Sequence, residues 1–184
     1  MLRRGRRLRR LYWARLRLGA IRPQGSSESW VSRLARAAID TSVVIEYIDL
    51  RGELHEQAEA VFSAALAGRL EIFIPHAVLA ETFYVATKIY RTLGVERAEA
   101  VASKLVEWLY RLPTARVVGE GVQLALEAGG VKLAYNLALT DCYVLAVSKL
   151  YGCTAVFKKR EREMLRNIGE LERNYKLLFL EDYR

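Results

Sequence analysis

The feature that most constrains the fold is a regular alternation of short apolar runs with longer helical stretches, which begins at residue 37. A short apolar run bounded by turn residues indicates a buried strand, whereas apolar residues recurring every three or four positions indicate a helix. Strands that alternate with helices favour an α/β sandwich around a mostly parallel sheet. The expected strands are residues 37–40, 71–75, 115–118, 154–157 and 176–180.

Glycines mark the expected ends of the helices, because glycine readily adopts the left-handed backbone that follows a last helical turn. Gly68, Gly94 and Gly152 each follow a helical stretch, and Gly129-Gly130 is expected to end another helix in the same way. A charged helix follows the fourth strand. The other helices are predicted over residues 53–67, 76–90, 95–111, 120–128 and 139–151.

Length and composition exclude several classes of protein. The chain of 184 residues, with 52% hydrophobic and 27% charged residues, is long enough for one domain with a core of its own. Two cysteines cannot form the disulfide framework of a small secreted protein. No apolar run approaches the roughly 18 residues that span a bilayer. We therefore expect a cytoplasmic protein without a membrane partner.

The net charge of +8 is concentrated at the N-terminus. Residues 1–36 hold eleven arginines and one acid, which gives this segment a charge of +10. The remaining residues carry 18 basic and 20 acidic side chains, a charge of −2. We therefore divide the chain into a basic, flexible N-terminal extension over residues 1–36 and a domain over residues 37–184.

Three interpretations of the basic extension stay open. It could be a solvated arm that contacts RNA phosphates electrostatically. It resembles an organellar targeting peptide in being rich in arginine and nearly free of acids. It could also result from a misassigned translation start, with the true start near Val31.

Three acidic residues occupy positions where apolar side chains are expected. Asp40 stands at the carboxyl end of the first expected strand, the edge at which ligands bind in open α/β sheets. Glu81 and Asp141 lie on the helix faces that should be buried. Their neighbours three and four positions away are Ala77, Val78, Tyr84 and Val85 for Glu81, and Leu137, Ala138, Val144 and Leu145 for Asp141.

Carboxylates on apolar faces are costly unless something pairs with them. The structural alternative is that Asp141 caps a helix and Glu81 meets an arginine. If the three acids converge, their mutual repulsion requires a cation, and oxygen ligands suit Mg²⁺ or Mn²⁺. Such an ion binds phosphates and activates water.

The acidic positions lie in motifs that resemble those of PIN-domain ribonucleases, especially VapC-type toxins. Residues 40–47 read Asp-Thr-Ser-Val-Val-Ile-Glu-Tyr, which is similar to the opening signature of the family. Residues 79–81, Leu-Ala-Glu, resemble its second acidic position, and residues 139–146, Leu-Thr-Asp-Cys-Tyr-Val-Leu-Ala, its third. The resemblance covers about residues 37–180.

This resemblance implies a three-layer α/β/α fold and a metal-dependent endonuclease that cleaves RNA. Asp40, Glu81 and Asp141 would be the catalytic residues and the ligands of Mg²⁺ or Mn²⁺. It also implies a small antitoxin as partner and a homodimer.

One departure concerns a fourth acid, which the family carries in a Thr-x-Asp pattern after the last core strand. Counted from Asp141 without gaps, the threonine falls on Phe157 and the aspartate on Lys159. Glu161 lies two positions later. Its neighbours are a mixture of apolar and charged residues, which is compatible with either a fourth metal ligand or a surface residue. The departure favours a second interpretation, a catalytically weak PIN-like module that binds RNA or protein.

Several further residues are weaker candidates. Thr41 and Ser42 are expected either to support Asp40 or a water by hydrogen bonding, or only to cap the first helix. Glu46 is interpreted as a partly solvated helical residue. The basic residues Lys158, Lys159 and Arg160 are expected either to bind RNA phosphates or to form an ordinary basic turn.

Overall fold

The computed structural model describes residues 34–119 and 121–184, so nearly all of the predicted basic extension lies outside the described residues. Five strands form one sheet in the order β3-β2-β1-β4-β5, and every neighbouring pair is parallel. This confirms the predicted sheet. The strands are β1 (Ala35–Ile39), β2 (Leu70–Pro75), β3 (Ala115–Val118), β4 (Thr154–Phe157) and β5 (Leu177–Phe179).

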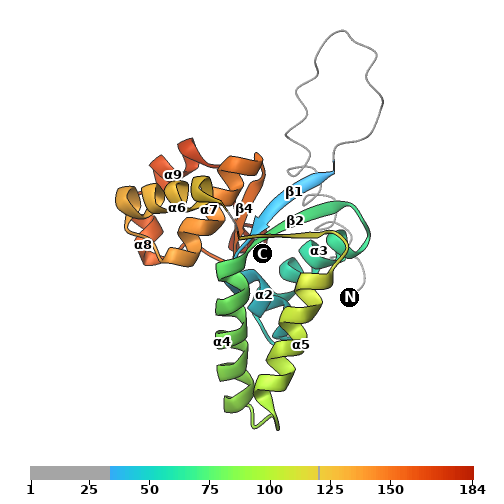
Figure 1. Cartoon of the computed structure of the whole chain (residues 1–184). Coiled ribbons are helices and arrows are strands. Elements are labelled where there is room, and N and C mark those ends of the chain that lie inside the picture. The colour runs from blue at the N-terminus through green and yellow to red at the C-terminus, as the bar shows by residue number, and fades with distance from the viewer. Residues whose placement is uncertain (1–33, 120) are drawn as a thin grey trace, which may run out of the picture.

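Helices connect each strand to the next and cover both faces of the sheet. Right-handed crossovers place the helices that follow β1 and β2 on one face, and those that follow β3 and β4 on the other. Figure 1 shows α4 and α5 as a hairpin that extends away from the sheet. The helices are α2 (Thr41–Ile48), α3 (His55–Leu66), α4 (His76–Thr92), α5 (Ala98–Arg111), α6 (Val122–Tyr135), α7 (Leu139–Tyr151), α8 (Arg162–Leu165) and α9 (Ile168–Asn174), and a final 3₁₀ turn covers Leu180–Tyr183.

The strand order reverses at β1, and this reversal fixes where a site can form. The chain adds β2 and β3 on one side of β1, then crosses back to add β4 and β5 on the other. Ligands of open α/β sheets bind outside the carboxyl ends of the strands at such a switch point. Asp40 directly follows β1, and Lys158 directly follows β4.

The core consists of buried apolar side chains on both faces of the sheet. Ile39 and Phe73 on the strands are fully buried, as are Val144 and Leu145 on α7, which packs across the central strands. Both cysteines are free and buried, as expected of small apolar side chains. No helix within the two described ranges is long and apolar enough to cross a membrane.

The predicted helix end at Gly129-Gly130 is wrong. Helix α6 continues through both glycines to Tyr135 and ends where Asn136 adopts a positive φ of 52°. A glycine inside a helix costs about 1 kcal/mol relative to alanine. Buried Ala128 and Val131 on either side hold the inner face of α6 in the core, and their burial outweighs that cost. The predicted start at residue 120 lies outside the described residues.

Candidate active site

Asp40 is held at the junction between β1 and α2. It is the N-cap of α2, and its carboxylate accepts a hydrogen bond from the backbone N of Ser42 at 2.8 Å. The residue is only 6% exposed. Burial raises the pKa of Asp40 to about 6, and the charge of Glu81 adds to the rise, while hydrogen bonds from Ser42 and Thr41 oppose it. The end of β1 thus carries a carboxylate whose ionised form is disfavoured by burial.

Glu81 lies in the second turn of α4 and is half-buried. Its Oε2 accepts a hydrogen bond from Oγ1 of Thr41 at 2.9 Å. Thr41 comes from the first turn of α2 and is itself buried. This hydrogen bond therefore fixes the Glu81 carboxylate relative to Asp40, although the two residues belong to different helices.

Asp141 lies in the first turn of α7 and is also 6% exposed. Burial raises its pKa to about 8, and the charges of Asp40, Glu161, Glu81 and Glu163 add to the rise in that order. The N-cap of α7 is Ala138, and no side chain caps this helix end. The helix-capping alternative for Asp141 therefore receives no support from the structure.

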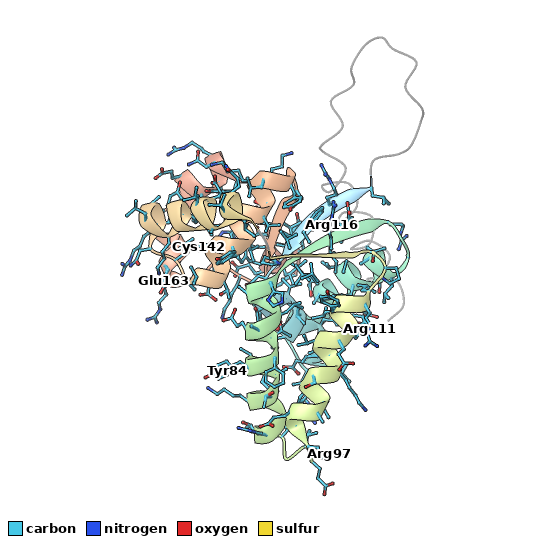
Figure 2. All side chains as sticks on the ribbon, viewed as in Figure 1. Tyr84, Arg97, Arg111, Arg116, Cys142 and Glu163 are labelled. Atoms are coloured by element: carbon cyan, nitrogen blue, oxygen red, sulfur yellow. The ribbon has the colours of Figure 1, made fainter. Side chains whose placement is uncertain are left out.

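Glu161 is exposed and forms the N-cap of the short helix α8. We refer to Asp40, Glu81, Asp141 and Glu161 as the acidic cluster, because the charges of the other three all act on Asp141. Glu163, two residues further along the chain in α8, adds to the same negative potential. It lies close to the start of α7, near Cys142 (Figure 2), and its charge raises the pKa of that thiol as well.

The acidic cluster has the chemistry of a divalent cation site. Within the described parts of the chain, none of its four carboxylates forms an ion pair with a lysine or arginine. Buried carboxylates that repel one another and lack a basic partner fit a hard cation. Among residues 34–119 and 121–184, no three acidic, histidine or cysteine side chains are already gathered as a metal site.

A second network fixes the end of β4 against α2. The hydroxyl of Ser42 accepts a hydrogen bond from the backbone N of Lys158 at 3.1 Å. The side chain of Lys158 forms an ion pair with Glu46, whose Oε1 also accepts a hydrogen bond from the backbone N of Leu54 at 2.6 Å. Ser42 thus contacts both Asp40 and the strand that leads to Glu161.

The interpretation of Glu46 as a partly solvated residue is wrong. Its side chain is only 2% exposed, because the loop before α3 closes over it. A Cβ atom at Gly52 would lie 2.5 Å from Oε1 of Glu46, so a side chain at this position would have to displace the Glu46 carboxylate. Glu46 lies within the signature over residues 40–47, but no local pattern in the sequence identifies Lys158 as its partner.

The three basic residues after β4 are placed in different surroundings. The ammonium group of Lys158 forms an ion pair with Glu46. The Arg160 guanidinium donates to Asp182 at 2.7 and 2.9 Å and to Glu181 at 3.1 Å, which ties this turn to the C-terminus. Lys159 is exposed. Of the three, Lys159 is the side chain whose position leaves it open to a ligand.

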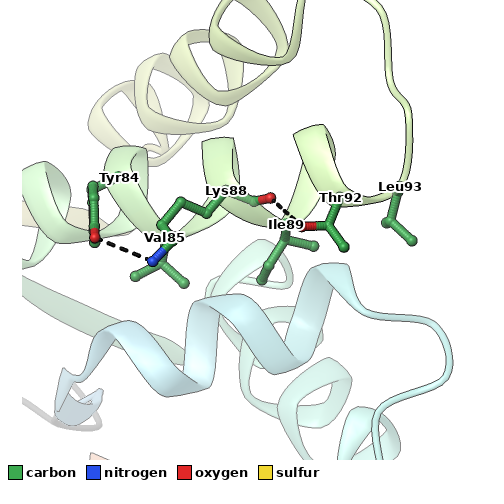
Figure 3. A pocket seen from close by; sticks show the side chains of 6 residues that line it. All are labelled: Tyr84, Val85, Lys88, Ile89, Thr92 and Leu93. Atoms are coloured by element: carbon green, nitrogen blue, oxygen red, sulfur yellow. Dashed lines mark hydrogen bonds between the residues drawn. The ribbon is translucent and has the colours of Figure 1, made fainter.

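A hollow of about 400 Å³ runs along α4 beyond the acidic cluster (Figure 3). Tyr84, Val85 and Lys88 line it, and they follow Glu81 at helical spacing on the same side of α4. The ammonium group of Lys88 donates to the hydroxyl of Tyr84 at 3.3 Å. A ligand in this hollow would therefore lie about one helical turn from Glu81.

A scan of protein-family models decides the family. The model of the PIN domain matches residues 37–171, most of the chain. The chain belongs to the PIN domain family. PIN domains are nucleases, so membership supports nuclease chemistry in general. The match begins within β1 and includes all four acids of the cluster.

Solved structures agree with this PIN fold. VapBC2 from Rickettsia felis, bound to a promoter DNA fragment, has a TM-score of 0.54 at 16% identity, covering 78% of this chain and 98% of that one. DNA-bound VapBC from Salmonella typhimurium has a TM-score of 0.53 at 17% identity, with 79% and 98% covered. PAE2754 from Pyrobaculum aerophilum has a TM-score of 0.52 at 20% identity, with 80% and 92% covered. A comparison with curated proteins finds no significant match.

Proposed function

We propose that this PIN domain is a divalent-metal-dependent endoribonuclease that hydrolyses phosphodiester bonds in RNA. The observation that carries the proposal is the environment of Asp141. This buried carboxyl group lies within the fields of Asp40, Glu161 and Glu81, at the carboxyl edge of the sheet. Such an arrangement destabilises the empty site and favours one that contains a cation.

Asp40, Glu81 and Asp141 would hold Mg²⁺ or Mn²⁺, with Glu161 as a fourth group. When bound, the cation would offset the negative charge of a phosphodiester and lower the pKa of a water molecule. The protein's own side chains would orient the carboxylates. Hydrogen bonds from Ser42 and Thr41 orient Asp40 and Glu81, so that the carboxylates lose little conformational freedom on binding.

RNA would approach from the solvent side of the cluster, where Glu81 is half-buried and Glu161 is exposed. One of these acids would position the attacking water in line with the leaving oxygen. We propose that Lys159 contacts RNA phosphates. Lys158 and Arg160 would bind RNA only by leaving their acidic partners Glu46 and Asp182. The basic extension over residues 1–36 would add electrostatic attraction to RNA phosphates that does not depend on the base sequence.

We further propose that the chain is the toxin of a toxin–antitoxin pair, acts in the cytoplasm, and forms a homodimer. Similarity of fold to VapBC complexes from Rickettsia felis and Salmonella typhimurium supports a small antitoxin as partner. The nuclease domain would occupy residues 37–184.

RNA cleavage tests the proposed function. A labelled structured RNA is incubated with the full chain in EDTA, and then with Mn²⁺ or Mg²⁺ in excess. We expect cleavage only with the added ion. A second candidate, an RNA- or protein-binding module without turnover, is favoured by Lys159 at the position of the family's fourth acid. Tight RNA binding without cleavage at any Mn²⁺ concentration would support that candidate and refute the nuclease.

A further inference from the structure

The loop that carries Glu161 has little regular structure of its own. Residues 158–161 lie outside any helix or strand, and α8, which follows them, has only four residues. So short a helix is not stable in isolation, because its hydrogen bonds do not offset the cost of nucleation. Met164 is buried and holds the far end of α8. Contacts of the loop itself must therefore fix where α8 begins.

Arg160, the residue directly before Glu161, makes these contacts. Its guanidinium donates to the Asp182 carboxylate at 2.7 and 2.9 Å and to Oε1 of Glu181 at 3.1 Å. The same Oε1 accepts the backbone N–H of Arg160 at 2.8 Å, so one carboxylate holds both the backbone and the side chain. The guanidinium carbon also lies 4.2 Å from the centre of the Phe179 ring. We call Arg160, Glu181 and Asp182 the Arg160 clamp.

The 3₁₀ turn that carries the two acids of the clamp is itself anchored to the core. Leu180 is fully buried, and Gln57 of α3 donates to the carbonyl oxygen of Tyr183 at 3.0 Å. The backbone N–H of Glu181 donates to the carbonyl oxygen of Lys158 at 3.1 Å. The loop over residues 158–161 is therefore held against a fixed turn at Lys158 and again two residues later.

The clamp leaves the carboxylate of Glu161 available to the acidic cluster. Glu161 makes no capping hydrogen bond at the start of α8, and within the described ranges it forms no ion pair. Arg160 is its nearest basic neighbour along the chain on that side, but Glu181 and Asp182 already neutralise the guanidinium. The charge of Glu161 raises the pKa of Asp141, so this carboxylate lies within electrostatic reach of the cluster.

We propose that the Arg160 clamp positions Glu161 as the fourth acid of the metal site. This inference rests on the proposed function, because the divalent ion is the ligand that Glu161 would meet. An exposed glutamate on a mobile loop loses conformational entropy when it binds an ion, and a backbone that is already fixed reduces that loss. Arg160 is thus a positioning residue, which acts through Glu161 and contacts neither the ion nor the RNA.

Amide hydrogen exchange of the full chain in EDTA tests the positioning without any ion. Arg160→Met should speed exchange over residues 158–165 by at least about tenfold, because several charge-assisted hydrogen bonds are lost. Exchange in β1 and β2 should not change. Arg184→Gln is the matched control, since it removes an exposed ion pair of the neighbouring residue with Glu53 but no contact of the loop. Native exchange rates in the loop of Arg160→Met would refute the inference.

Calorimetry with Mn²⁺ measures the consequence for the ion. Arg160→Met should raise the Kd for Mn²⁺ about tenfold, as loss of an outer contact of a metal ligand does. The sign separates positioning from charge, because removal of a cation near the cluster would by charge alone tighten Mn²⁺ binding. Arg160→Lys, which keeps the charge but not the paired hydrogen bonds, should fall between the native chain and Arg160→Met. Unchanged or tighter binding by Arg160→Met would refute the inference.

A double-mutant cycle shows whether the clamp acts through Glu161. Arg160→Met combined with Glu161→Gln should bind Mn²⁺ no more weakly than Glu161→Gln alone, whereas additive losses would refute the positioning role. Glu181→Ala, which removes the acceptor of the Arg160 backbone N–H, enters the same cycle if Arg160→Met does not fold. A native chain that binds no Mn²⁺ would refute the proposed metal site, and this inference with it. Native Mn²⁺ binding by both clamp variants would refute the inference alone.

Discussion

The carboxylate of Glu46 forms an ion pair with the ammonium group of Lys158, across the junction between α2 and the end of β4. Glu46 is buried, whereas the Lys158 side chain is 29% exposed. Hydrogen bonds connect this pair to the acidic cluster. The backbone N–H of Lys158 donates to the hydroxyl of Ser42, and the backbone N–H of Ser42 donates to the carboxylate of Asp40. The geometry of the strand ends thus depends on a residue outside the cluster.

Removal of the ammonium group should destabilise the fold. We expect Lys158→Met to lower the free energy of unfolding by about 2–4 kcal/mol, because it leaves the buried Glu46 carboxylate without its charged partner. Urea unfolding at pH 7 measures this. Lys159→Met, at the next and exposed position, is the matched control and should change stability by less than about 0.5 kcal/mol. Equal values for the two variants would mean that the ion pair does not stabilise the fold.

A side chain at Gly52 should destabilise the fold, and a second substitution at Glu46 can test whether overlap with its carboxylate is the cause. A Cβ atom there would overlap the Glu46 carboxylate, so Gly52→Ala should cost about 1–3 kcal/mol. The same substitution in a Glu46→Ala background should cost much less, because the overlapping atoms are gone. Urea unfolding of the four proteins forms a double-mutant cycle. Additive effects would contradict the predicted overlap.

The stability of the metal-free protein should fall as the pH rises. The pKa values of Asp40 and Asp141 are raised from 3.8 to about 6 and about 8, so the folded protein binds more protons than the unfolded chain between these values. The free energy of unfolding therefore decreases from about pH 4 to about pH 8, by at most about 1.4 kcal/mol per pH unit for each group.

Unfolding in EDTA at pH 5 and pH 8 measures this pH dependence. Asp141→Asn should raise stability at pH 8 and flatten the dependence, since its amide does not ionise. Glu59→Gln, which removes an exposed carboxylate of α3, should leave the dependence unchanged. A native protein that is more stable at pH 8 than at pH 5 would show that the acids are stabilised by partners instead.

Divalent ions should bind the acidic cluster with a stoichiometry near one in the absence of RNA. Asp40, Glu81 and Asp141 supply three negative charges, which suit one ion better than two. Calorimetry with Mn²⁺ should show one ion per chain, with binding weakened most by Asp141→Asn and less by Glu161→Gln. Lys159→Asp should strengthen binding if that side chain faces the cluster. Two tight ions per native chain would contradict this prediction.

The basic extension should contribute affinity for RNA but no catalysis. Deletion of residues 1–33 leaves β1 intact and removes ten of the chain's arginines. RNA binding should weaken, and its dependence on salt should become less steep, because fewer counterions are released. Cleavage at saturating RNA should persist. A truncated protein that is folded but inactive at saturation would place part of the site in the extension.

The sequence was sufficient to predict the sheet and the three unusual acids, because both follow from local patterns. Apolar runs predicted β3 and β4 with the observed bounds, and carboxylates on apolar faces predicted Asp40, Glu81 and Asp141 as unusual. Interactions between distant segments were not predictable. The pair of Glu46 with Lys158 joins residues more than a hundred positions apart, and α6 continues through its glycines because neighbouring side chains are buried in the core.

The central claim is that the acidic cluster carries out metal-dependent cleavage of RNA. The single-turnover rate of RNA cleavage in saturating Mn²⁺, compared between Asp141→Asn and Glu59→Gln, tests it most directly. We predict that Asp141→Asn remains folded and cleaves more than about a hundredfold more slowly than the native chain, equivalent to roughly 2.7 kcal/mol of barrier. Glu59→Gln should cleave at the native rate. A folded Asp141→Asn variant with native cleavage would contradict the account.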